Sequence, residues 1–124
     1  MANVTGSWLG TYWQNGKPTR FEATFVQSRN VFSGRILDEE PPGEAQVSGD
    51  IIGRHIDFVK NYFSVLETIH YTGTLSDDEN FLSGQWNIGS QQSGAWEAHR
   101  SDNSLTNEFK KRMQQSTPVL GNNR

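Results

Sequence analysis

The sequence predicts an all-β protein, an eight-stranded antiparallel up-and-down barrel. Apolar and polar residues alternate with period two over most of the chain, which is the pattern of strands with one buried face. The links between these segments are short and carry turn residues, so consecutive strands are expected to pair antiparallel. A five-residue pattern recurs along the chain: a large apolar residue, Ser or Thr, Gly, a variable residue and another large apolar residue. It occurs at VTGSW (4–8), FSGRI (32–36), VSGDI (47–51), YTGTL (71–75) and LSGQW (82–86).

Eight segments fit strands, in chain order: about 4–13, 19–27, 31–38, 44–52, 54–61, 66–76, 81–88 and 93–100. Asn-Gly-Lys at 15–17 is a strong hairpin signal, and proline interrupts the longer loop at 39–44. The remaining links are the short polar turns 28–30 and 77–80 and a tight turn at 52–54. We therefore expect a barrel domain over residues 1–101, a short helix over 102–116 and a frayed tail over 117–124.

The repeated glycines are predicted to face the barrel interior. In LSGQW the residues that share one face of a strand are Leu82, Gly84 and Trp86. Glycine inside a strand costs roughly 0.5–1 kcal/mol relative to alanine, so its repeated use needs a compensating reason. Sharp coiling in a small closed barrel supplies one. The alternative is a twisted sandwich with glycines at bulges.

Composition excludes several classes of function. The 124 residues suggest one domain, and the net charge of −3, with no dense basic patch, argues against nucleic acid as a partner. The chain has no cysteine and no apolar run long enough to span a membrane. Because its start, MANVTGSW, lacks the features of a signal peptide, we expect a cytoplasmic protein. The three histidines, His55, His70 and His99, have outward parity and no metal-ligand spacing, so no metal, cofactor or catalytic group is predicted.

Strand parity and direction predict one closed end and one open end. Near the start of the first strand the inward residues are almost wholly apolar, apart from Arg100. The opposite end collects inward polar groups, including Asp38, Lys60 and Glu67, as expected for an open mouth. The sequence leaves three alternatives for the Lys60 side chain. Its ammonium group reaches solvent, meets an anionic ligand, or pairs with an acidic side chain, for which Glu67 is the nearest inward candidate.

Two further features carry a resemblance to a known group. Gly6-Ser7-Trp8 in the first strand, with Arg100 ending the last, resembles the signature of the calycin superfamily, which contains lipocalins, fatty-acid-binding proteins and avidins. In that superfamily the first-strand Trp packs against the basic residue at the closed end, through a cation–π contact. The segment FLSGQWNIGSQQSGAWEAHR (81–100) is similar to the last hairpin of streptavidin-like bacterial barrels.

The resemblance implies roles for particular residues. Trp86 and Trp96 match positions that wall the avidin pocket, the second reaching in from a neighbouring subunit, and Tyr71 stands where a third pocket Trp is expected. The first turn, TYWQNGK, lacks the Asn and Ser arrangement that grips biotin, and Ile36 replaces a pocket Tyr. The resemblance therefore implies an avidin-like fold without biotin binding.

The leading hypothesis is a protein that binds a small, partly apolar molecule in the barrel mouth. In one variant of this hypothesis the molecule also carries a negative charge. The runner-up is a non-catalytic assembly module whose barrel is filled by its own side chains, and a hydrolase or isomerase using the mouth is third. The sequence leaves open whether the chain forms a homo-oligomer. Trp8 and Arg100 are predicted to form the closed end, and the predicted ligand-binding residues are Tyr12, Phe21, Ile36, Phe58, Lys60, Tyr71, Trp86 and Trp96.

Overall fold

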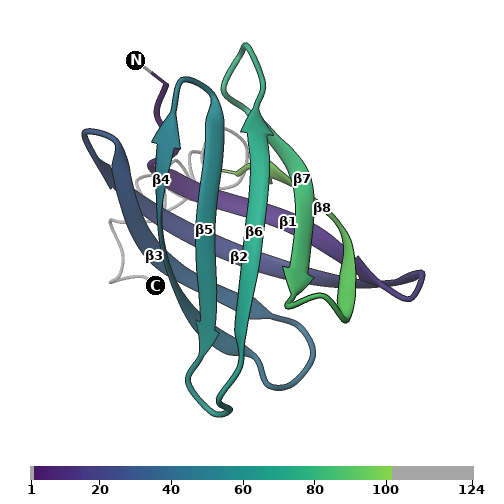
Figure 1. Cartoon of the computed structure of the whole chain (residues 1–124). Helices are drawn as coiled ribbons and strands as arrows, with labels where there is room; N and C mark the ends of the chain where they lie inside the picture. Colours follow the sequence, from purple (N-terminus) through teal and green to yellow (C-terminus); the bar gives the residue numbers. More distant parts are fainter. Residues whose placement is uncertain (1, 102–124) are drawn as a thin grey trace, which may run out of the picture.

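Eight antiparallel strands, each hydrogen-bonded to its neighbours in chain order, close into a barrel when β1 pairs with β8 (Figure 1). This computed structural model describes residues 2–101, so the helix and tail predicted for 102–124 lie outside the described residues. The barrel prediction is confirmed, and the sandwich alternative is excluded. The strands are β1 (Gly6–Gln14), β2 (Lys17–Ser28), β3 (Val31–Asp38), β4 (Glu44–Ile52), β5 (His55–Tyr62), β6 (Thr68–Leu75), β7 (Phe81–Ile88) and β8 (Gln92–Arg100).

Turn chemistry fixes the hairpins. Asn15 and Gly16 have φ values of 53° and 78°, the left-handed conformation that a two-residue hairpin turn requires. The mouth is formed by this turn and by the loops at 39–43, 63–67 and 89–91. Among residues 2–101, no helix is long and apolar enough to cross a membrane.

Three predicted strand starts are wrong by two residues, and one of them is that of the second strand, which begins at Lys17 rather than residue 19. The first strand begins at Gly6 rather than Val4, because the Val4 N–H donates to the side-chain oxygen of Gln27 (2.8 Å) rather than to a backbone carbonyl of the neighbouring strand β2. The sixth strand begins at Thr68 rather than residue 66. Glu67 therefore lies in the preceding loop and is exposed, not inward-facing as predicted.

Aromatic rings fill the middle of the barrel. Phe58 and Tyr71 stack with their ring centroids 4.8 Å apart. Trp96 meets both rings edge-on, at 5.8 and 5.5 Å, which is a favourable arrangement for aromatic pairs. Phe25 and Phe32 close the layer below. The centre of the barrel described by residues 2–101 is thus packed by the protein's own side chains.

The inward glycine Gly84 lies where two strands approach closely. A Cβ added there would clash with the Thr72 carbonyl oxygen and the Gly73 Cα of β6. Both obstacles are backbone atoms, so no side chain can move aside to make room. The repeated glycine therefore permits the strand contact that the barrel's curvature requires.

Replacing Gly84 by valine is expected to lower the free energy of unfolding by about 3 kcal/mol, the upper part of the usual range for overpacking. Gln85→Val is the matched control, because Gln85 is the adjacent, exposed residue of the same strand and a β-branched residue suits that position. Urea denaturation measures both variants. Equal stabilities would mean that Gly84 has no role in curvature.

Candidate ligand site at the barrel mouth

A buried ion pair lies beneath the mouth. The Lys60 ammonium of β5 donates to both carboxylate oxygens of Asp38 at the end of β3, at 2.9 and 3.0 Å. Both side chains are 0% exposed. The pair spans the barrel interior, since β3 and β5 are not neighbouring strands. A buried charge needs such a partner to offset its lost hydration.

Three tyrosines surround this pair. The Tyr62 and Tyr12 hydroxyls donate to Asp38 Oδ2, at 2.5 and 3.3 Å, and the Tyr71 hydroxyl oxygen lies 3.5 Å from Lys60 Nζ. The ammonium also faces all three rings, at 4.9 Å from the Tyr12 centroid, 4.8 Å from Tyr62 and 5.6 Å from Tyr71. The Asp38 carboxylate is therefore well supplied with donors, and the Lys60 charge is screened by aromatic faces.

Burial sets the protonation of these groups. Desolvation lowers the pKa of Lys60, and the Asp38 carboxylate opposes that shift. Desolvation raises the pKa of Tyr12, Tyr62 and Tyr71, and the negative charge of Asp38 adds to the effect. A phenol keeps its proton at neutral pH even at its ordinary pKa, and the raised pKa values extend this state, in which Tyr12 and Tyr62 can donate to Asp38, to more alkaline pH.

A cavity of about 190 Å³ opens above the tyrosines. Tyr12 and Trp86 form part of its wall with an edge-on contact at 6.2 Å. The indole N–H of Trp86 is already used, since it donates to the Trp13 carbonyl oxygen (3.0 Å). The cavity is lined by Tyr12, Gln14, Pro41, Pro42, Tyr62, Glu67, Ile69, Tyr71, Trp86, Ile88 and Gln92.

Three of the predicted ligand-binding residues line this cavity: Tyr12, Tyr71 and Trp86. The other five are buried without lining it: Phe21, Ile36, Phe58, Lys60 and Trp96. The indole N–H of Trp96 donates to the Thr72 carbonyl oxygen (2.9 Å) within the same barrel. The structure thus brings the eight residues into one interior, with three at the mouth and the rest beneath it or along its sides.

The alternatives for Lys60 are resolved in favour of pairing, but the predicted partner is wrong. Lys60 neither reaches solvent nor pairs with Glu67; it pairs with Asp38. Sequence reasoning placed Asp38 inward and left it without a role. Tyr62 was not among the predicted ligand-binding residues, although its parity matches that of Phe58 and Lys60 on the same strand.

At the closed end, the side chains of Arg100 and Trp8 contact backbone carbonyl groups. The Arg100 guanidinium lies 4.4 Å from the Trp8 ring centroid. It also donates to the carbonyl oxygens of Thr5, Asn3 and Glu79, at 2.7, 2.8 and 2.9 Å. Trp8 Nε1 donates to the Val4 carbonyl oxygen (2.9 Å). These bonds fold the N-terminal residues across the bottom of the barrel, opposite the mouth.

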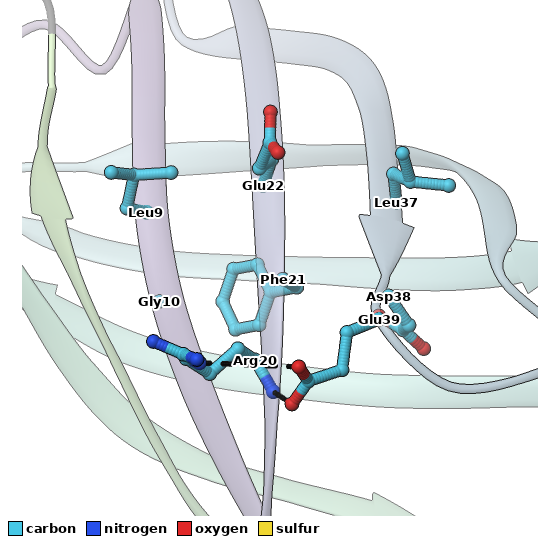
Figure 2. Close-up of a pocket in the computed structure, with 8 residues that line it drawn as sticks. All are labelled: Leu9, Gly10, Arg20, Phe21, Glu22, Leu37, Asp38 and Glu39. Carbon is cyan, nitrogen blue, oxygen red and sulfur yellow. Dashed lines mark hydrogen bonds and ion pairs between the residues drawn. The ribbon is translucent and has the colours of Figure 1, made fainter. Parts of the chain in front are cut away.

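A second hollow, of about 340 Å³, lies on the outer wall over β1, β2 and β3 (Figure 2). Leu9, Glu22 and Leu37 project from the barrel around it, and Arg20 pairs with Glu39 at its edge. Leu9 and Leu37 are 38% and 54% exposed. This hollow is a candidate contact surface, but it has no aromatic wall comparable with that of the mouth.

The histidines lie apart from the mouth, because none lines its cavity. His70 Nε2 is 2.7 Å from Asp57 Oδ1 on the outer wall. In the part of the chain that the structure describes, no three His, Asp or Glu side chains group closely enough to hold a metal ion. The aromatic rings and hydrogen-bonding side chains that line the mouth suit it to binding through those contacts.

Comparison with known proteins identifies the fold alone. No protein-family model matches the chain, and no match is found among curated proteins. A solved structure described as a de novo designed fluorescence-activating β-barrel is similar, with a TM-score of 0.59 and 14% sequence identity. The match covers 77% of this chain and 92% of the designed one. The protein is thus an eight-stranded barrel similar to a designed barrel, with no family assigned.

Proposed function

We propose that the protein binds a small, partly apolar molecule in the mouth of the barrel. The observation that carries this proposal is the cavity of about 190 Å³ walled by Tyr12, Tyr71 and Trp86. An apolar cavity of about 150 Å³ is known to accept benzene, so the size suits a single ring or a short chain. Aromatic faces with a few polar groups at one end are typical of small-molecule sites.

The anionic version of the ligand loses its main support. That version depended on a free Lys60 ammonium, whereas Lys60 is held by Asp38 at 2.9 and 3.0 Å. The ion pair is neutral as a unit and lies beneath the tyrosines. It supports the cavity by fixing the positions of the Tyr12 and Tyr62 rings rather than by attracting a ligand charge.

We also infer a relationship to the calycin superfamily, of the avidin type. The support is the contact of Arg100 with the ring of Trp8, on strands β8 and β1, where the resemblance implies it. The position of Trp86 in the mouth wall is consistent with the same relationship.

The assembly module is the second candidate. It is favoured by the aromatic filling of the central barrel and by the exposed Leu9 and Leu37 beside the outer hollow. On this alternative the outer wall of β1 to β3 contacts another chain.

Saturation-transfer NMR with benzyl alcohol tests the leading proposal, because this neutral single-ring probe fits the mouth and the method detects weak binding. Transfer of saturation from the natural protein to the ring protons of benzyl alcohol is expected. Ile88→Trp should abolish it, since Ile88 is half-buried in the cavity wall and a larger ring there fills the space. Val26→Trp is the control, because Val26 lies exposed on the outer wall of β2.

Equal transfer in both variants would mean that the probe binds elsewhere. Absence of transfer in all three proteins would overturn the proposal. If sedimentation then shows association that Leu37→Lys disrupts, the assembly module becomes the leading function.

A further inference from the structure

Two hydroxyls at the mouth, those of Tyr12 and Tyr62, can act only as acceptors towards a ligand. Each tyrosine hydroxyl has one hydrogen, and those of Tyr12 and Tyr62 are directed to Asp38. These hydroxyls therefore offer only lone pairs to a molecule in the cavity. The buried Asp38 carboxylate in this way makes two of the wall residues acceptors.

Glu67 gives the same cavity a negative charge. It is the only charged residue among those lining the mouth cavity. Within residues 2–101 it has no ion-pair partner, whereas the nearby acids Glu39 and Glu44 are matched by Arg20 and Arg35. The mouth thus presents one uncompensated carboxylate beside its neutral aromatic wall.

An apolar groove adjoins the cavity. It has a volume of about 630 Å³ and is lined by Pro41, Pro42, Ser64, Val65, Leu66 and Glu67. Three of these residues, Pro41, Pro42 and Glu67, also line the mouth cavity, so the two spaces share a border. The Leu66 side chain is fully exposed, and such an apolar surface next to a binding cavity suits the apolar part of a ligand.

We propose that the mouth binds an organic ammonium ion carried on an apolar chain, that is, a cationic amphiphile. This inference rests on the proposed function and specifies its ligand class. The ammonium group donates to the Tyr12 and Tyr62 hydroxyl oxygens, lies against the Trp86 face and is balanced by Glu67. The chain leaves the cavity over Pro41, Pro42 and Leu66. A carboxylate or phosphate in the same place would meet lone pairs and a like charge.

Calorimetry at pH 7 with octylammonium, 1-octanol and octanoate tests this ligand class, since the three probes share one chain and differ in head-group charge. Octylammonium is expected to bind at least about tenfold more tightly than octanoate, as one charge-assisted contact predicts. Glu67→Gln should remove most of that preference and leave 1-octanol binding unchanged. Glu22→Gln is the matched control, because it removes the same charge from the outer wall.

Leu66→Ser tests the position of the chain and should weaken octylammonium more than butylammonium. Equal binding of the three octyl probes would overturn the cationic ligand class while leaving the proposed cavity intact. A preference for octylammonium that survives Glu67→Gln would overturn the assignment of Glu67. Binding of none of the probes, together with no transfer from benzyl alcohol, would overturn both proposals.

Discussion

Replacing Trp8 by alanine is expected to lower the free energy of unfolding by roughly 3–5 kcal/mol, the usual cost of removing a buried aromatic side chain. Trp8 is 1% exposed, and its indole donates to the Val4 carbonyl oxygen. Its ring also supports the Arg100 guanidinium, which binds the backbone of Asn3 and Thr5. The substitution therefore leaves a cavity and loosens the segment that covers the closed end.

Phe63→Ala is the control for loss of an aromatic ring, because Phe63 is exposed in the loop between β5 and β6; a change below about 1 kcal/mol is expected there. Arg100→Ala should have a milder effect than Trp8→Ala, since water can replace part of its contacts with carbonyl groups. Urea unfolding followed by circular dichroism measures all three. A Trp8→Ala variant as stable as the natural protein would show that the Trp8 and Arg100 pair does not stabilise the barrel.

The fold could be predicted because its signals are local. Alternation with period two, the Asn15 and Gly16 turn and the short links determine antiparallel neighbours within a few residues of sequence. The same parity places Trp8 and Arg100 at one end, where they are paired between β1 and β8. Barrel closure then follows, since β1 and β8 are the two strands left with a free edge.

The site could be predicted only in part, because its contacts cross the barrel. Parity gave the inward direction of Lys60 and Asp38, but their pairing depends on how far β3 and β5 approach through the interior. The prediction for Glu67 failed for another reason. A strand boundary wrong by two residues moved it from an exposed loop to the interior, and strand ends are the least defined part of an alternating pattern.

Asp38→Ala is expected to destabilise the protein by about 3–5 kcal/mol, because it leaves the Lys60 ammonium buried without a counter-charge. Two tyrosine hydroxyls, of Tyr12 and Tyr62, lose their acceptor in the same step. Lys60→Met alone should also destabilise, by a smaller amount, since those two hydroxyls still donate to the remaining carboxylate. Thermal and urea unfolding give the free energies.

The double variant Asp38→Leu, Lys60→Met, measured beside the single variants Asp38→Leu and Lys60→Met, separates the energy of the pair from the cost of breaking it. It should recover the part of the loss that comes from the unpaired charge, because replacing a buried ion pair by apolar side chains is often neutral. The Tyr12 and Tyr62 hydroxyls remain without their acceptor, so that part of the loss persists. The interaction energy from this double-mutant cycle is then expected to be large although the pair adds little net stability. If the double variant instead loses the sum of the two single changes, Lys60 and Asp38 are not coupled in solution. If it is stable but no longer binds benzyl alcohol, the ion pair acts by holding Tyr12 and Tyr62 in the positions that shape the mouth.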